Sequence, residues 1–351
     1  MNKSYFHRVQ SETPTRFWIN NPTVEQAKLA IEAGAIGATT NPAYVSKLFE
    51  SEEDFQVVLN TIDELLPSES DDSIVAARVQ QVMVKRIAQV FQPLWEESNG
   101  QIGLVTIQGD PHRETDAQHI IDEGLENIEI APNICIKIPV TTWGIDAIVK
   151  MVEHDIPTMA TEVMGLSQAI SICEAYQAAS ERTGKTPLFW VTHITGILDD
   201  HFKRVVEQQN LVIDERLFAY AGLSIAKKQY ALLNERSYPG IFIGGGARKL
   251  EDFTELVGGK LDITINWKGT ADVLIGEDRP ADKRIGVNLS EEEIEQLKAT
   301  LPDYARAIEL DGMTADEYFD YGGVELFRTA FQKGWDELLA LIAERRRSKN
   351  E

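Results

Sequence analysis

Residues 133–139, NICIKIP, form a short apolar run of the kind that becomes a strand buried on both faces of a parallel sheet. An amphipathic stretch follows, with Ile145, Ile148, Val149 and Val152 on one helical face. Together these two stretches make one strand–helix unit. The fold class depends on how often that unit recurs along the chain.

The unit recurs over most of the length, and no Pro/Gly/Ser-rich linker interrupts it. A helix that begins at Asn21-Pro22 and ends at Gly34 is expected, and residues 54–66 and 73–92 have helical patterns. The expected strands are Phe17–Ile19, Ala35–Ala38, Ile102–Gln108, Ile134–Ile138, Thr158–Val163, Leu188–His193, Ile241–Ile243 and Leu261–Ile265. This alternation predicts an α/β (β/α)8 TIM barrel. A doubly wound dinucleotide-binding sheet would need a Gly-x-Gly-x-x-Gly after its first strand.

The pattern changes after residue 276. Residues 290–293 (SEEE) form a capping box, and two or three helices follow, including Val324–Ile342. We expect one barrel domain over residues 1–351, with residues 277–351 as additional C-terminal helices packed on the barrel.

The composition excludes several classes of partner. The chain has 351 residues with 34 Lys+Arg against 56 Asp+Glu, a formal charge of −22, which argues against nucleic-acid binding. Its N-terminus has no apolar leader, and no stretch approaches the roughly 20 apolar residues of a membrane span. Cys135 and Cys173 lie in apolar runs and suit a reducing compartment. We expect a cytoplasmic protein with no nucleic-acid or membrane partner.

In a (β/α)8 barrel, the active site lies at the carboxyl ends of the strands. Polar residues at the expected strand ends are Asn20, Thr39, Asn41, Gln108, Asp110, Lys137, Thr161, Glu162, His193 and Arg248. Lys137 stands out because it lies inside an apolar strand. Burial without a partner would lower its pKa and free the amine to attack carbonyls; the alternative is a lysine paired with a carboxylate inside the barrel.

Several segments in register resemble one family. Residues 38–42 (ATTNP) resemble the Thr-Thr-Asn-Pro signature of transaldolases and their relatives, the fructose-6-phosphate aldolases. Residues 136–141 (IKIPVT) resemble the Schiff-base lysine motif of that family. The segments at 144–145, 156–161 and 168–169 keep the order and spacing. The similarity extends from Phe17 to Trp267 and includes a last helix at residues 323–327.

The resemblance implies catalytic roles for matching positions. Lys137 would attack a ketose carbonyl and form a Schiff base, whose iminium accepts electrons when the neighbouring carbon–carbon bond breaks. Thr161 and Gln108 would position the water that carries protons. At the Gln108 position transaldolases typically carry Glu and the aldolase relatives carry Gln, which favours the aldolase side.

The resemblance also implies substrate contacts. Thr40 and Asn41, from the Thr-Thr-Asn-Pro segment, would contact the substrate, with Asn41 holding a hydroxyl. Arg248 and the preceding Gly246 fit the phosphate contact of the family, and loops after late barrel strands suit a phosphate on general grounds.

Three positions depart from the family pattern. Asn20 occupies the place of the Asp that takes a proton from the substrate hydroxyl, and an amide cannot do so. Gly196 occupies the place of a phosphate-binding Arg. His193 aligns with an aromatic residue, a catalytic Tyr in the aldolase relatives, and is interpreted equally well as a replacement base or as a structural histidine.

Two further carboxylates are interpreted as structural. Strand alternation would turn Glu162 away from the side that Thr161 faces, toward a salt bridge with a helix. Asp110 and Arg113 are expected to form a supporting ion pair.

The resulting hypothesis is an enzyme that transfers, or cleaves off, a dihydroxyacetone unit from a ketose phosphate or related ketose through Lys137. No metal and no cofactor are expected, since the histidines show no ligand spacing. The partner is a small sugar or sugar phosphate, and a homo-oligomer is compatible with the sequence. The alternative is a catalytically impaired binding or regulatory protein, because of Asn20.

Overall fold

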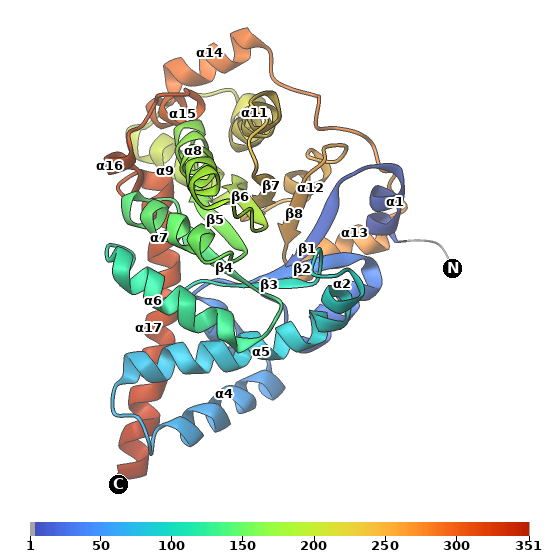
Figure 1. Cartoon of the computed structure of the whole chain (residues 1–351). Helices are drawn as coiled ribbons and strands as arrows, with labels where there is room; N and C mark the ends of the chain where they lie inside the picture. The colour runs from blue at the N-terminus through green and yellow to red at the C-terminus, as the bar shows by residue number, and fades with distance from the viewer. Residues whose placement is uncertain (1–3, 351) are drawn as a thin grey trace.

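The computed structural model describes residues 4–350, and its central feature is a closed barrel of eight strands (Figure 1). Each strand pairs in parallel with the next, and β8 closes the barrel against β1. The predicted (β/α)8 barrel is therefore confirmed. The strands are β1 Arg16–Asn20, β2 Ala35–Thr39, β3 Leu104–Ile107, β4 Ile134–Pro139, β5 Thr158–Val163, β6 Phe189–Ile194, β7 Ile241–Gly245 and β8 Asp262–Ile265. Residues 1–3 and 351, which the expected domain includes, lie outside the described residues.

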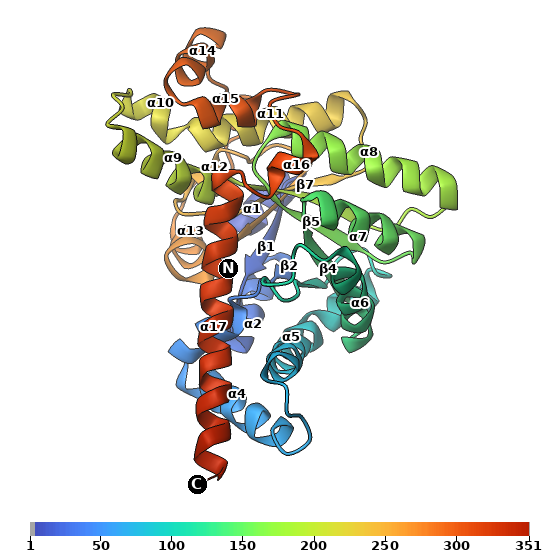
Figure 2. The ribbon, with the colours of Figure 1, turned by 90° about the vertical axis from the view of Figure 1, so that its left-hand side faces the viewer.

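Helices surround the barrel and fill the connections between strands (Figures 1 and 2). They are α1 Tyr5–Glu12, α2 Val24–Ala33, α3 Tyr44–Lys47, α4 Glu52–Leu65, α5 Asp72–Glu97, α6 Ala117–Asn127, α7 Thr142–Glu153, α8 Leu166–Thr183, α9 Thr195–Gln209, α10 Glu215–Ala219, α11 Ala221–Glu235, α12 Glu251–Thr254 and α13 Asp272–Gly276. Short 3₁₀ segments cover Leu48–Glu50 and Ile128–Ile130, and a π-helical turn covers Trp267–Ala271. Within residues 4–350, no helix is long and apolar enough to cross a membrane.

The predicted start of α2 is displaced. Its N-cap is Thr23, not Asn21, because Thr23 and Gln26 form a reciprocal capping box. Asn21 instead has a positive φ of 45° and belongs to the turn after β1. The helix ends as expected at Gly34, whose φ of 107° suits only glycine.

Large apolar side chains fill the amino-terminal half of the barrel interior. Trp18, Cys135, Met159 and Trp190 pack there with two aliphatic residues. Both indole N–H groups donate to the buried carboxylate of Asp262, at 3.0 Å from Trp18 and 2.8 Å from Trp190. Because this half is packed, space for a ligand is left at the carboxyl ends of the strands.

The C-terminal segment supplies α14 Glu291–Thr300, α15 Pro302–Ile308, α16 Ala315–Tyr318 and α17 Gly322–Asn350. The predicted capping box at Ser290 is present and starts α14. The long helix α17 runs beside the barrel and continues along α4 (Figure 2). Its first half brings aromatic side chains to the barrel mouth, where Phe327 and Phe331 line the cavity described below.

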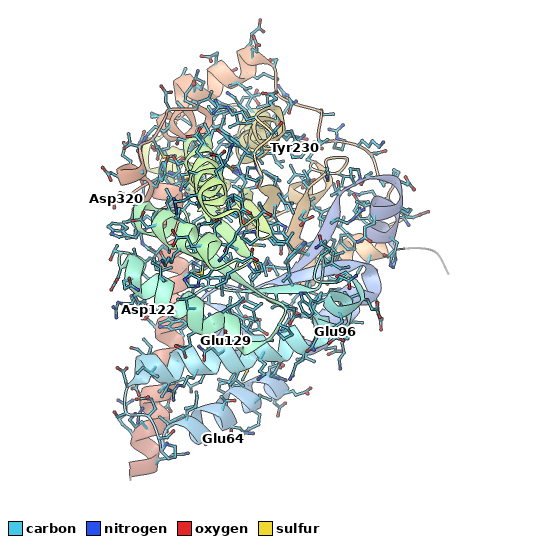
Figure 3. All side chains as sticks on the ribbon, viewed as in Figure 1. Glu64, Glu96, Asp122, Glu129, Tyr230 and Asp320 are labelled. Carbon is cyan, nitrogen blue, oxygen red and sulfur yellow. The ribbon has the colours of Figure 1, made fainter. Side chains whose placement is uncertain are left out.

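The outer helices carry exposed carboxylates. Glu64 on α4, Glu96 on α5 and Asp122 on α6 are exposed carboxylates on the outer helices (Figure 3).

Candidate active site

A cavity of about 210 Å³ lies at the carboxyl ends of the strands. Six of the residues singled out in the sequence line it: Asn20, Thr39, Asn41, Lys137, Gly246 and Arg248. They come from β1, β2 and β4 and from the loops that follow β2 and β7. The barrel therefore brings together residues that are more than two hundred positions apart in the chain.

Lys137 contributes a buried amine to this cavity. It lies on β4, only 5% of the residue is exposed, and Nζ donates a hydrogen bond to the carbonyl of Thr40 at 3.4 Å. Within residues 4–350 it forms no ion pair with a carboxylate at 4 Å or less, so the alternative of a charge-paired lysine is wrong. Burial lowers its pKa to about 8. The amine is thus held closer to its nucleophilic, neutral form than an exposed lysine.

The segments flanking Lys137 are held by two residues of the shared motifs. A Cβ at Gly144 would overlap the carbonyl oxygen of Pro139, so only glycine lets α7 start this close to β4. The side chain of Gln168 accepts from the amide of Met164 at 2.8 Å and donates to the carbonyls of Val140 at 3.0 Å and Glu162 at 3.2 Å. These contacts fix the ends of β4 and β5 relative to each other.

Asn20 belongs to a hydrogen-bonded network across three strand ends. Its Oδ1 accepts from the hydroxyl of Thr39 at 2.9 Å, and its Nδ2 donates to Oδ1 of Asn266 at 2.8 Å. The hydroxyls of Thr39 and Thr264 lie 2.7 Å apart. The network lines the cavity. No carboxylate is present among the described residues of the cavity lining.

Gln108 lies beside the cavity rather than in its lining. Its Nε2 donates to two buried carboxylates, Glu162 at 3.1 Å and Glu114 at 3.3 Å. Thr161 is fully buried, and its hydroxyl has no hydrogen-bond partner among the described residues. The prediction that Glu162 turns outward to a helix salt bridge is wrong. The register between β5 and β6 shifts between Ala160 and Val163, and this irregularity breaks strand alternation.

Three other sequence predictions need correction. His193 is fully buried and shares a hydrogen bond of 3.2 Å with Gln229 on α11, so it faces away from the cavity and cannot serve there as the base. The Thr40 hydroxyl donates to the carbonyl of Thr106 at 2.6 Å, so this side chain ties β2 to β3 rather than holding substrate.

The expected ion pair between Asp110 and Arg113 does not form. Arg113 instead pairs with Asp116 at 3.0 Å. The Asp110 carboxylate accepts from the amide of His112 at 2.9 Å, which closes the turn after β3.

Two cations occupy the far end of the cavity, Arg248 and Lys47. Nε of Arg248 pairs with Asp200 at 3.1 Å, and about half of both side chains is exposed. Lys47, at the end of α3, was not singled out in the sequence. Desolvation of its ammonium group and the positive charge of Arg248 lower its pKa, as expected for two cations that line the same cavity.

Gly196, the second departure from the family pattern, packs directly against Arg248 at this cationic end. A Cβ there would lie 2.7 Å from Cγ of Arg248 and would overlap the carbonyl oxygen of Gly246. The glycine therefore lets the start of α9 approach the loop after β7. With Lys137, the cavity lining holds three cations. Within residues 4–350, no three His, Cys, Asp or Glu side chains are grouped as metal ligands.

Comparison with known proteins identifies the family. The family model described as Transaldolase/Fructose-6-phosphate aldolase matches residues 17–341. The chain belongs to this family. Its membership confirms the resemblance seen in residues 38–42 and 136–141, and those family motifs supply the lining residues Asn41 and Lys137.

Individual relatives of this family member are distant. The transaldolase of Mycobacterium ulcerans (strain Agy99) is 24% identical over 212 residues, which cover 57% of this chain and 55% of that protein. The transaldolase of Mycobacterium leprae (strain Br4923) is 26% identical over 230 residues, 62% of this chain and 58% of that protein. The match thus spans less than two thirds of either relative. The solved structure of oxaloacetate acetylhydrolase with oxalate covers 92% of this chain and 96% of its own at 12% identity, but its TM-score of 0.31 carries no functional argument.

Proposed function

We propose that this family member is a Schiff-base enzyme that cleaves a ketose phosphate, or transfers its dihydroxyacetone unit, through Lys137. The observation that carries the proposal is the unpaired, buried amine of Lys137 in a cavity at the strand ends. A neutral amine adds to the ketose carbonyl and expels water, and the iminium accepts the electron pair of the breaking carbon–carbon bond. Asn41, also in the cavity lining, would orient a substrate hydroxyl.

The cations at the far end favour an anionic substrate tail. Arg248 and Lys47 can bind a phosphate between them, with the Arg248 guanidinium turning from Asp200 toward the ligand. Lys47 supplies positive charge close to the place where Gly196 has replaced a family arginine. The substrate is therefore proposed to be phosphorylated at the end remote from its carbonyl.

Borohydride reduction tests this function. The full-length protein is mixed with fructose 6-phosphate, fructose or dihydroxyacetone, reduced, and analysed by peptide mass spectrometry. We expect a reduced adduct on Lys137, and none in the Lys137→Met variant. Failure of a broad ketose panel to label Lys137 contradicts the proposal. Assays with and without an acceptor aldehyde then separate transfer from simple cleavage.

The second candidate function is a binding protein that has lost turnover. The absence of any carboxylate among the described cavity-lining residues favours it, because no group there can take a proton from the substrate hydroxyl as Asp does. Calorimetric binding of fructose 6-phosphate without any product or adduct would support this alternative.

A further inference from the structure

Glu162 has an unusual backbone conformation for a glutamate. Its φ is +59°, in the left-handed region that favours glycine, although it lies inside β5. Gln168 holds this conformation by donating to the Glu162 carbonyl at 3.2 Å. A non-glycine residue keeps such a conformation only where surrounding contacts impose it, and such residues gather at functional sites.

The backbone conformation changes where the carboxylate goes. In a regular strand, Glu162 would point to the face opposite to Thr161. Here the strand irregularity turns it so that Oε1 accepts a hydrogen bond of 3.1 Å from Gln108, at the end of β3. This bond links β5 to the end of β3, and β4, the strand that carries Lys137, lies between these two strands. The Glu162 side chain is fully buried.

Buried polar atoms without partners collect around this carboxylate. Oε2 of Glu162, Oγ1 of Thr161, Oε1 of Gln108 and Oε2 of the neighbouring Glu114 have no hydrogen-bond partner among the described residues. Thr161 pairs in register with Pro139, two residues after Lys137. Buried polar groups in native proteins are normally satisfied, so a set of open acceptors and donors indicates a place where water or a reaction intermediate binds.

We propose that Glu162 is the carboxylic acid that exchanges protons with the Schiff-base intermediates on Lys137, through one water held by Gln108 and Thr161. The inference rests on the proposed function and adds to it the proton source. Neither shared motif contains this residue, and strand alternation excluded it.

The neutral amine of Lys137 adds to the ketose carbonyl, and a proton moves from nitrogen to oxygen to give a neutral carbinolamine. The Glu162 acid then protonates the hydroxyl through the water, the C–O bond breaks, and one water leaves. The products are a cationic iminium and the Glu162 carboxylate, which is its counter-ion. Hydrolysis of the final Schiff base runs the same steps in reverse, with Glu162 accepting the proton.

The charged neighbours of Glu162 allow both of its protonation states. Burial raises its pKa, while the hydrogen bond from Gln108, the charge of Lys137 on β4 and that of Arg328 on α17 oppose this shift. Glu114, before α6, shares the Gln108 amide; burial and the charge of Glu162 raise its pKa, and Arg328 opposes this. Glu162 is also the strongest influence that raises the pKa of Lys137 against the effect of burial.

The test is the pH profile of Schiff-base formation in the full-length protein. Protein and fructose 6-phosphate are mixed, quenched with borohydride at increasing times, and the Lys137 adduct is quantified by mass spectrometry. In the wild type the rate should rise as the amine loses its proton and fall as the acid loses its own. Glu162→Gln should lower the rate about 100-fold near neutral pH and remove the alkaline fall.

Glu114→Gln is the matched control, because Glu114 is a buried carboxylate on the same Gln108 amide. This variant should keep the decrease in rate at alkaline pH, and its rate of Schiff-base formation should lie within about threefold of the wild-type rate. If Glu162→Gln does not fold, Glu162→Gly is used for the same test, since glycine adopts this φ without strain.

Three outcomes overturn the inference. One is an unchanged profile in the Glu162 variant, another is an equal loss of rate at every pH, and the third is the same change in Glu114→Gln. In each of these the wild type still labels Lys137, so the proposed function survives. Absence of any wild-type adduct removes both proposals.

Discussion

The hydroxyl of Thr39 donates to Oδ1 of Asn20 at 2.9 Å, and this one bond sets the orientation of the Asn20 amide. With the oxygen turned to Thr39, the nitrogen faces Asn266 and donates to it at 2.8 Å. Both ends of the amide are engaged, so Asn20 forms a fixed link among the ends of β1, β2 and the loop after β8. An aspartate could keep the bond from Thr39, and a turned Asn266 amide could donate to its second oxygen.

Asn20→Asp should therefore fold and should raise the rate of ketose phosphate cleavage. The added carboxylate takes a proton from the substrate hydroxyl, and general-base help is typically worth about 10²–10⁴ in rate. Steady-state cleavage of fructose 6-phosphate measures the effect. Asn266→Asp, which adds the same charge to the same network, should give no comparable gain. An unchanged rate in Asn20→Asp would mean that another group already acts as the base.

The cationic end of the cavity should determine affinity for phosphate. Arg248→Ala and Lys47→Ala should each raise KM for fructose 6-phosphate about 10- to 100-fold, because charge-assisted hydrogen bonds contribute about 1.5–3 kcal/mol. Neither should change KM for dihydroxyacetone, which has no phosphate. Lys249→Ala is the control, since that ammonium group is bonded to Asp199 at 2.9 Å and does not line the cavity. Equal effects on both substrates would show that these cations do not bind phosphate.

The family arginine cannot be restored at Gly196 without disturbing the site. Any side chain there would press on the backbone of Gly246 and on Arg248. Gly196→Ala should lower stability by about 1–3 kcal/mol, and Gly196→Arg by at least as much. Chemical denaturation measures both. Gly276→Ala is the control, because a Cβ at Gly276 meets nothing within 4 Å. A fully stable Gly196→Arg with tighter phosphate binding would contradict this packing argument.

The fold was predictable because each apolar run is bounded by polar or glycine residues and is followed by a helical pattern. The same logic located Lys137, Asn41 and Arg248 at strand ends, where the structure places them in the cavity lining. Lys47 was not found, since α3 is a short helix whose position depends on packing rather than on a strand.

Strand alternation is followed at His193 and broken at Glu162. The sequence leaves His193 open as a base or a structural residue, and the structure puts Thr192 and Ile194 in the cavity lining and His193 outside it, as strand alternation requires. For Glu162 the same rule gives the wrong face, because a positive φ within β5 cannot be anticipated at a glutamate. A local irregularity of one residue thus turns the Glu162 carboxylate toward Gln108.

His193→Gln should leave the pH profile of activity unchanged. Burial lowers the pKa of His193 to about 4, so the ring is neutral at working pH and faces Gln229 rather than substrate. The pH dependence of kcat/KM between about pH 6 and 8 measures this. Loss of an acidic limb in the variant would show instead that His193 titrates during the reaction.

Lys137 and Lys227 are both buried, and burial lowers the pKa of each, but among the described residues only Lys227 has a carboxylate within 4 Å. The pKa of Lys137 is lowered from 10.5 to about 8 in the folded protein, so the unfolded chain holds the proton more tightly. Lys137 therefore lowers the free energy of unfolding. This penalty is present in full below about pH 8 and disappears as pH rises to about 10.5. Lys137→Met should thus stabilise the protein at pH 7 by on the order of 3 kcal/mol, since one pKa unit corresponds to about 1.4 kcal/mol.

Lys227 supplies the matched contrast, because its ammonium group is buried but paired with Glu255 at 3.0 Å. Lys227→Met removes one of the two cations bonded to the buried Glu255 carboxylate, while Arg284 at 3.0 Å remains, and it should destabilise the protein by about 1–3 kcal/mol. Denaturant unfolding of both variants near pH 7 and pH 10 measures these effects. The increase in stability caused by Lys137→Met should be smaller near pH 10, because the desolvation penalty of the Lys137 ammonium group is largely lost there. A gain that is independent of pH would show that the methionine acts through packing and that the amine of Lys137 carries no desolvation penalty.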